Sequence, residues 1–142
     1  MKKVSFQEIT RRIDISKLPR VDCVVGIGTG GIIPAALIAY KLGCEFSPLF
    51  INYRNEENNP IHQEPIILDG WGIPREVKKI LLVDDVSVSG KTLQKAKELL
   101  GDFEIVTLVL CGKADYVLFA EITECVAWPW KNNRAQEGAL CL

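Results

Sequence analysis

Apolar runs alternate along this chain with helical patterns, and the alternation predicts a sheet of mostly parallel strands. Runs typical of buried strands occupy residues 21–27, 46–53, 80–83 and 105–110, and weaker ones lie at 115–119 and 125–128. Apolar residues at helical spacing predict helices over residues 5–15, 32–42 and 92–100, and the first of these begins with a Ser-x-x-Glu capping box. Strands that alternate with helices are typical of an α/β fold with helices on both faces of the sheet.

A long polar stretch interrupts this pattern after the second strand. Residues 54–59 are polar and are followed by Pro60, and residues 61–79 contain two prolines and two glycines around a short apolar run at 66–68. That run is compatible with a short excursion or an edge strand. Loops of this length inside a compact domain are usually functional or disordered. The tail at residues 131–142 shows no clear pattern.

Length and charge narrow the class of protein. The 142 residues predict one domain, residues 1–142, and the hydrophobic share of 48% is ordinary for a globular protein. The net charge of -1 predicts no general attraction to nucleic acid or to an anionic membrane. Charged residues are spread over the first 20 positions, so we expect no signal peptide or membrane span and a cytoplasmic location. The expected partner is a small molecule.

Cysteine and histidine contents argue against several kinds of site. The five cysteines show no CxxC spacing, and their odd number argues against a closed disulfide framework, so we expect them to be reduced and mostly structural. His62 is the only histidine, and it falls in the long polar stretch. A zinc site and a Cys-His or Ser-His pair would both have to use it, which disfavours both.

The segment Gly26-Ile27-Gly28-Thr29-Gly30-Gly31 fits GxGxxG between a predicted strand and a predicted helix. A dinucleotide site also needs an acidic residue about 20 positions further on, but the second strand ends at Asn52-Tyr53. Two other interpretations remain open. The segment is either a tight turn or an anion site in which glycine backbone N–H groups at a helix N-terminus receive a phosphate or pyrophosphate.

Two adjacent acids, Asp84 and Asp85, follow the apolar strand at residues 80–83. This places them at the carboxyl end of a strand, where open α/β sheets bind ligands. Hydrophobic packing does not explain two adjacent carboxylates at the end of a buried strand. They suit the two vicinal hydroxyls of a ribose, either directly or through magnesium, which prefers oxygen ligands.

The residues after the acids predict a phosphate-binding loop at the start of a helix. Hydroxyl side chains and a glycine stand close together there: Ser87, Ser89, Gly90 and Thr92. The triplet Gly90-Lys91-Thr92 also suggests a nucleoside-triphosphate loop, but that pattern needs a glycine where Asp85 stands, so we reject it. A solvated helix cap next to a strand-end acid pair is the simpler alternative.

At this motif the chain resembles the type I phosphoribosyltransferases, whose signature is an apolar strand, two acids, a short linker and a Gly-x-Thr or Gly-x-Ser turn. It is most similar to the hypoxanthine, xanthine and guanine branch, because Val126-Ala127-Trp128-Pro129-Trp130 resembles the C-terminal Val-Val-Phe-Pro-Trp element of that branch. The resemblance covers most of residues 21–130, in order. Only the segment from Asp84 to Thr92 is highly specific.

The resemblance implies a fold, a reaction and a set of binding residues. The fold would be a doubly wound, mostly parallel sheet with a minimal hood, and the assembly a homo-oligomer. The reaction would be magnesium-dependent transfer of the ribose 5-phosphate of phosphoribosyl pyrophosphate to a nucleobase, with a purine favoured and pyrophosphate released. Asp84 and Asp85 would hold the ribose hydroxyls and Mg²⁺. The remaining phosphoribosyl pyrophosphate ligands would be Val86, Ser87, Val88, Ser89, Gly90, Lys91 and Thr92, with Thr29, Gly30 and Gly31 at the pyrophosphate.

The same resemblance implies a closing loop and a base site. Residues 54–69 would close over the site and exclude water from the reacting centre. The base site would consist of Lys113, Cys125, Val126 and Trp130. Trp128 and Trp130 either face the base or pack against the sheet edge.

The chain departs from the 6-oxopurine branch at the positions that read the base. Val88 stands where that branch has an aspartate that contacts or deprotonates the purine, so no catalytic residue is assigned. Cys125 replaces the stacking aromatic, and Lys131 replaces an acid. The expected base-contacting lysine falls at Cys111, so Lys113 serves only with a shift of two positions. Thr29 stands where the pyrophosphate segment often has a basic residue, which removes a charge but leaves the backbone donors.

Three functions remain as hypotheses. The first is the transferase just described. The second is a regulatory module that binds a nucleotide or phosphoribosyl pyrophosphate but has lost catalysis, which the departures at Val88, Cys125 and Lys131 motivate. The third is a dinucleotide-dependent oxidoreductase, which rests on the glycine segment alone.

Overall fold

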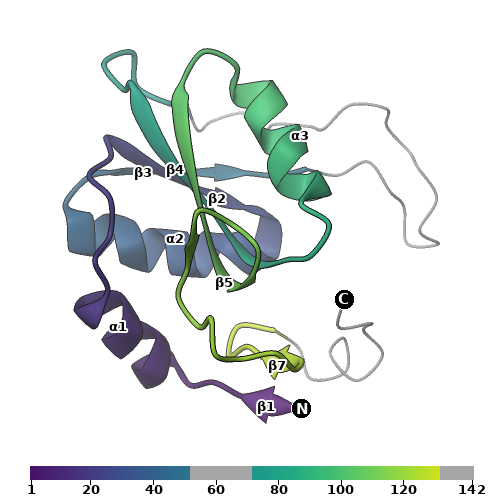
Figure 1. The fold of residues 1–142 in the computed structure, drawn as a ribbon. Coiled ribbons are helices and arrows are strands. Elements are labelled where there is room, and N and C mark those ends of the chain that lie inside the picture. Colours follow the sequence, from purple (N-terminus) through teal and green to yellow (C-terminus); the bar gives the residue numbers. More distant parts are fainter. Residues whose placement is uncertain (52–71, 132–142) are drawn as a thin grey trace.

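A parallel sheet forms the centre of the molecule in the computed structural model, which describes residues 1–51 and 72–131 (Figure 1). Its five strands lie in the order β3-β2-β4-β5-β6, and every neighbouring pair is parallel. The strands are β2 (Cys23–Ile27), β3 (Glu45–Leu49), β4 (Lys79–Ser87), β5 (Glu104–Gly112) and β6 (Tyr116–Val117). The helices are α1 (Phe6–Ile15), α2 (Gly28–Leu42) and α3 (Lys91–Leu100).

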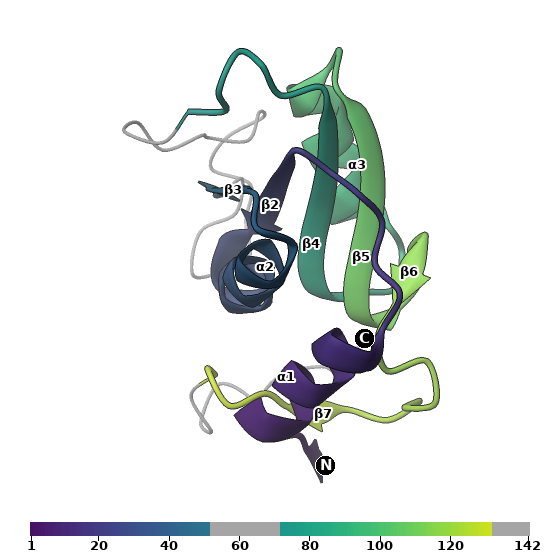
Figure 2. The same cartoon turned by 90° about the vertical axis from the view of Figure 1, so that its left-hand side faces the viewer.

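Helices α2 and α3 cover opposite faces of the sheet (Figure 2), so each face has its own hydrophobic core. Strand β4 contributes to both cores because successive side chains of a strand point to opposite faces. Leu81 and Val83 pack in the core with α2, whereas Ile80 and Leu82 pack in the core with α3. The doubly wound α/β prediction is therefore confirmed. None of the helices in residues 1–51 and 72–131 is long and apolar enough to span a bilayer.

A small layer lies beyond the carboxyl ends of β4 and β5, and we call it the hood (Figure 2). It consists of α1, β1 (Lys2–Lys3) and β7 (Val126–Ala127), and the two short strands pair in parallel apart from the main sheet. Arg12 of α1 donates to the Leu118 carbonyl and forms an ion pair with Glu121 at 2.6 Å. The hood is thus fastened to the chain that leaves β6.

The N-terminal helix α1 forms as its sequence predicts. The Ser5 hydroxyl accepts the Glu8 N–H at 3.1 Å, and the Glu8 carboxylate accepts the Ser5 N–H at 3.4 Å, which completes the capping box. Ile9 and Ile13 are fully buried on the inner face of this helix. The expected helix over residues 5–15 is confirmed.

Several predicted boundaries are wrong, and the reason is tertiary pairing. Helix α2 begins at Gly28 rather than at residue 32, so the last four residues of the glycine segment form its first turn. Strand β4 continues to Ser87 because its ladder with β5 extends that far, so Asp84 and Asp85 lie inside the strand. Strand β1 was not predicted, since two lysines carry no strand pattern. The expected closing loop at residues 54–69 lies outside the described residues.

The expectation of reduced cysteines needs a correction at one position. Cys23 and Cys111 are buried free thiols, and Cys44 is free and half-buried. Burial raises the pKa of Cys23 to about 12 and that of Cys111 to about 11, which makes both thiols inert. Cys125, however, is disulfide-bonded. An odd number of cysteines argues against a closed framework but does not exclude a single bridge. Cys141 lies outside the described residues.

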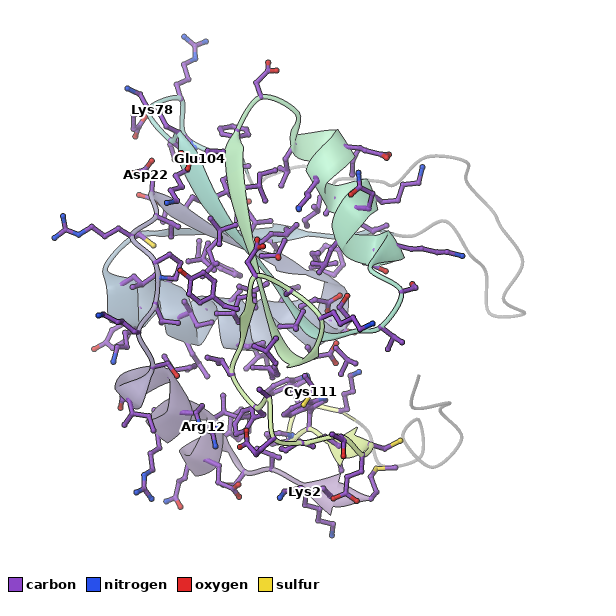
Figure 3. All side chains as sticks on the ribbon, viewed as in Figure 1. Lys2, Arg12, Asp22, Lys78, Glu104 and Cys111 are labelled. Atoms are coloured by element: carbon purple, nitrogen blue, oxygen red, sulfur yellow. The ribbon has the colours of Figure 1, made fainter. Side chains whose placement is uncertain are left out.

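Asp22 fixes the start of β4 at the end of the sheet remote from the hood (Figure 3). Its carboxylate accepts the backbone N–H groups of Lys79 at 2.9 Å and Lys78 at 3.0 Å, and these hydrogen bonds lower the pKa of Asp22. A carboxyl with a lowered pKa stabilises the folded state above the unfolded pKa of about 3.9, and the contribution disappears as the pH falls through the folded pKa.

We expect Asp22→Asn to lower the free energy of unfolding at pH 7 and to cost progressively less below pH 4. Urea unfolding of the variant and the wild type at pH 7, 4 and 3 measures the difference. Equal losses at all three pH values would contradict an ionisation-linked role for Asp22.

Candidate functional site

The acid pair Asp84 and Asp85 lies at the point in the sheet where the strand order reverses. The ladder between β2 and β4 ends at the pair Gly26 and Val83, whereas the ladder between β4 and β5 continues to Ser87 and Gly112. Strand β2 connects outward to β3, and β4 connects outward to β5 on the other side. Strand β4 therefore continues past the end of β2 at the switch point of the sheet, where doubly wound folds bind their ligands.

The first turn of α2 packs directly against this end of β4. A Cβ atom at Gly30 would lie 2.6 Å from the carboxyl group of Asp85, and one at Gly31 would lie 2.3 Å from the Val83 carbonyl oxygen. Glycine is thus required at both positions for close approach of the helix to the strand. The tight strand-to-helix turn expected for the glycine segment is therefore confirmed. The anion site stays a prediction, and the turn brings the start of α2 close to the acid pair.

The start of α2 has the features of an anion site. Its N-cap residue, Ile27, makes no side-chain hydrogen bond to the first turn. The first N–H groups of a helix have no partner within the helix, and they carry the positive end of its dipole. Thr29 is exposed there and Gly30 is half-buried. The expected pyrophosphate residues Thr29, Gly30 and Gly31 therefore lie together beside the acid pair.

The acid pair is held in an electrostatically unfavourable position. Asp84 Oδ1 accepts the Asp85 N–H at 2.8 Å, and Asp85 Oδ1 accepts the Val86 N–H at 2.8 Å. Burial, together with the adjacent Asp85 carboxylate, raises the pKa of Asp84 to about 8. A cation or a pair of hydroxyl donors at this position would relieve the repulsion.

The predicted phosphate-binding loop, residues 87–92, begins where β4 ends. The Ser87 side chain is buried and its Oγ has no hydrogen-bond partner. Gly90 is the N-cap of α3 and has no side chain to cap the helix, and only the Lys91 N–H is bonded to a nearby hydroxyl, Ser89 Oγ at 3.3 Å. A buried hydroxyl without a partner beside an uncapped helix N-terminus fits a phosphate that would satisfy both.

The expected base-site residues divide into two groups. The Lys113 backbone N–H donates to the Ser87 carbonyl at 2.8 Å, which places Lys113 next to the phosphate-binding loop. Cys111, two positions earlier, is buried at the hood end of β5 (Figure 3). Cys125 and Val126 belong instead to the hood, where the Cys125 carbonyl accepts the Lys2 N–H at 3.0 Å and Val126 packs on the core.

The two tryptophans of the C-terminal element have different environments. Trp128 is 2% exposed, and its ring lies 6.2 Å from that of Phe119, so it packs in the core. Trp130 stacks on Trp128 with ring centroids 5.6 Å apart and planes 2° apart. The Trp130 Nε1 is buried and has no partner. Trp130 is therefore the tryptophan with an unused hydrogen-bond donor.

Lys131 is the site residue that sequence reasoning missed. The sequence marked it only as a departure from an acid, yet its Nζ lies 2.6 Å from Asp85 Oδ2. The contact is an ion pair, since Oδ2 receives no directional hydrogen bond. The charge reversal at this position was a usable signal, because a lysine that replaces an acid near two other acids can neutralise one of them.

The donor set of the acid pair fits magnesium in part. Magnesium is usually bound by one or two carboxylates, with waters and substrate phosphates as the remaining ligands. Asp84 and Asp85 supply the two carboxylates. Within residues 1–51 and 72–131, no cluster of three or more metal-ligating side chains exists. At this position, waters and oxygens of a bound ligand would be the other ligands of a magnesium ion.

A concave surface lies at the other end of the sheet, where β2, β3 and β4 begin. Its volume is about 830 Å³, and its lining includes Arg20, Asp22, Glu45 and Lys79. It contains neither the acid pair nor the phosphate-binding loop. Its charged side chains have both signs, which does not favour a phosphorylated ligand. The candidate site is therefore the carboxyl end of the sheet.

Known proteins match this chain over both sequence and structure. The transcriptional regulator GfcR of Archaeoglobus fulgidus is 32% identical over 81 residues, which cover 56% of this chain and 40% of that protein. The xanthine-guanine phosphoribosyltransferase of Gluconobacter oxydans is 34% identical over 79 residues, which cover 54% of this chain and 46% of that enzyme. The chain thus spans about half the length, or less, of these two relatives.

A solved structure shows the same fold over nearly the whole chain. The purine phosphoribosyltransferase of Pyrococcus horikoshii superposes with a TM-score of 0.69 at 23% identity, and the match covers 92% of this chain and 93% of that one. The sequence model of the phosphoribosyl transferase domain matches residues 8–137, which include the acid pair, the phosphate-binding loop and most of the hood. This chain therefore belongs to the phosphoribosyl transferase domain family.

Proposed function

We propose that this chain binds phosphoribosyl pyrophosphate at the acid pair and transfers its ribose 5-phosphate to a nucleobase, with release of pyrophosphate. One observation carries the proposal. At the switch point of the sheet, the two carboxylates meet a buried Ser87 hydroxyl without a partner and the uncapped starts of two helices. Ribose hydroxyls and two phosphate groups are the chemistry that such an arrangement would bind.

Each part of the site would hold one part of the donor. Asp84 and Asp85 would accept hydrogen bonds from the ribose hydroxyls and would hold Mg²⁺. The 5-phosphate would be bound by residues 87–92 through the Ser87 hydroxyl and the backbone of the α3 N-terminus. The pyrophosphate would lie at the first turn of α2, at Thr29, Gly30 and Gly31. When bound, Mg²⁺ would neutralise charge on the pyrophosphate leaving group.

The protein's own part in the reaction would be to position and shield the reactants. The bond from the ribose to pyrophosphate breaks as a nucleobase nitrogen attacks, so positive charge develops on the sugar ring. The carboxylates beneath the ribose would stabilise that charge, and water exclusion would prevent hydrolysis. No side chain is assigned as a general base, because Val88 is 45% exposed and has no titratable group.

A purine is the acceptor that we favour. The Trp128-Pro129-Trp130 element places an aromatic ring with a free Nε1 donor in the segment that leads to the acid pair. The relative from Gluconobacter oxydans is named for xanthine and guanine. We also propose a homo-oligomer in the cytoplasm and no nucleic-acid or membrane partner, in keeping with the net charge of -1.

A second candidate function is ligand-responsive regulation without catalysis. Its support is the ion pair between Lys131 and Asp85, which places a lysine where the enzyme branch has an acid, together with Val88 at the position of an aspartate. One relative is named as a transcriptional regulator. In this alternative the site would bind phosphoribosyl pyrophosphate or a nucleotide and would not turn over.

A screen for pyrophosphate release tests the two candidates against each other. The protein is incubated with phosphoribosyl pyrophosphate, Mg²⁺ and each of the common purines and pyrimidines, and Asp85→Asn is the control for contaminating activity. We expect release that depends on a base and is lost in the control. Calorimetric binding of phosphoribosyl pyrophosphate without release under any base would instead support the regulatory module. Neither binding nor release would contradict both.

A further inference from the structure

Lys131 reaches the acid pair from a well-anchored position. Its backbone N–H donates to the Trp128 carbonyl at 3.1 Å, and Trp128 is 2% exposed in the core. Trp130, next to Lys131, is stacked on Trp128. The turn from Trp128 to Lys131 is therefore held by burial and stacking. From this turn the Lys131 side chain, 38% exposed, reaches a carboxylate whose side chain is 9% exposed.

The ion pair with Lys131 uses Oδ2 of Asp85, the carboxylate oxygen that accepts no backbone hydrogen bond. Its Oδ1 accepts the Val86 N–H at 2.8 Å, and its Oδ2 lies 2.6 Å from Lys131 Nζ. A divalent cation that binds Oδ2 must therefore displace the ammonium group or share the oxygen with it. Two positive groups at one carboxylate oxygen repel each other, so the ammonium and the metal compete.

The same ammonium group has the opposite effect on an anionic ligand. Without a cation, the negative charge of the acid pair repels a phosphorylated ribose. Lys131 offsets the charge of Asp85, so the repulsion falls. The Lys131 ammonium is also already part of the chain. It therefore avoids the loss of translational freedom that a metal ion bound from solution must undergo.

We propose that Lys131 is a tethered counter-ion of the ribose-phosphate site, which competes with a divalent cation for Asp85 and allows ribose 5-phosphate to bind without one. The proposal rests on the proposed function for the identity of the ligand. It predicts effects of opposite sign on metal and ligand when Lys131 loses its charge. A merely structural role for Lys131 would weaken both.

Metal binding is measured first, with Mn²⁺ alone as the probe and electron paramagnetic resonance as the readout. We expect Lys131→Gln to bind Mn²⁺ about fivefold more tightly than the wild type, the size expected for loss of one partly exposed charge. Lys131→Arg should keep the wild-type affinity. Lys95→Gln removes an equal charge from an exposed ion pair with Glu98 on α3 and should also keep it. Unchanged or weaker Mn²⁺ binding in Lys131→Gln would overturn the proposal.

Ligand binding is measured second, by calorimetry with ribose 5-phosphate in the presence of a chelator. The wild type should bind, and Lys131→Gln should bind about fivefold more weakly. Weakening of both ligand and Mn²⁺ in this variant would overturn the proposal in favour of a structural role. The two failures are distinguishable. A wild type that binds no ribose 5-phosphate, with or without Mn²⁺, contradicts the proposed function, whereas unchanged Mn²⁺ affinity contradicts the role of Lys131.

Discussion

Asp84→Asn should make the protein more stable and should weaken its binding of phosphoribosyl pyrophosphate. Asn is isosteric with Asp and can still accept the Asp85 N–H through its Oδ1, so the local hydrogen bond at 2.8 Å survives. It removes the buried negative charge that Asp84 carries next to Asp85 once the pH passes its pKa of about 8. Loss of a ligand to the ribose or the metal should weaken donor binding by about 100-fold, since even mutation of an outer-shell partner costs about 10–100-fold.

The stability gain should depend on pH in a defined direction. Burial and the neighbouring Asp85 carboxylate raise the pKa of Asp84 to about 8, far above its unfolded value. A carboxyl with a raised pKa contributes stability that is fully present below the unfolded pKa of about 3.9 and is lost as the pH rises through the folded pKa. The wild type is therefore destabilised most above about pH 8, whereas the Asn variant carries no such charge.

Urea unfolding at pH 5, 7 and 8.5 in the presence of a chelator measures the effect of Asp84→Asn. We expect the variant to exceed the wild type by about 1 kcal/mol or more at pH 8.5, with a smaller difference at pH 5. Asp22→Asn is the matched control of opposite sign, because the pKa of Asp22 is lowered. A destabilised Asp84→Asn variant at pH 8.5 would contradict the charge repulsion inferred for the acid pair.

Gly31→Ala should lower the free energy of unfolding relative to the wild type, although replacing a helical glycine by alanine usually raises it. Alanine in place of a helical glycine normally stabilises by about 1 kcal/mol. At Gly31, however, the new Cβ would lie 2.3 Å from the Val83 carbonyl oxygen and 3.1 Å from the Asp84 Cα. Both are backbone atoms in the central strand, so neither can rotate away. Overpacking of this kind costs about 1–3 kcal/mol, and we expect a net loss of about 2 kcal/mol.

Thermal and urea unfolding measure this loss, and two other glycines are its controls. Gly72→Ala should be close to neutral, since a Cβ there meets nothing within 4 Å. Gly30→Ala should be milder for stability but harmful for ligand binding, because its Cβ would lie 2.6 Å from the Asp85 carboxyl group, a side chain that can move. A Gly31→Ala variant as stable as the wild type would show that α2 can withdraw from β4 without cost.

Local pattern was enough to predict the helices and the main strands of the fold, and it located the acid pair at the end of a strand. The capping box at Ser5 and the helical spacing of Ile9 and Ile13 are properties of residues within a few positions of each other. The apolar strand, the two acids and the glycine turn that follow it are equally local. Such patterns predict secondary structure well because the hydrogen bonds and side-chain faces that they specify form within one element.

The sequence by itself therefore determined an α/β fold with an acid pair at a strand end and a serine- and glycine-containing turn after it, whereas three decisive features came only from the tertiary structure. Strand β4 continues past β2 because its ladder with β5 extends to Ser87. The hood exists because β1 pairs with β7 across most of the chain. Lys131 forms an ion pair with Asp85, which lies 46 positions earlier in the sequence. Each is a contact between residues far apart in sequence, and no local periodicity specifies which distant partner a strand edge or a charge will find.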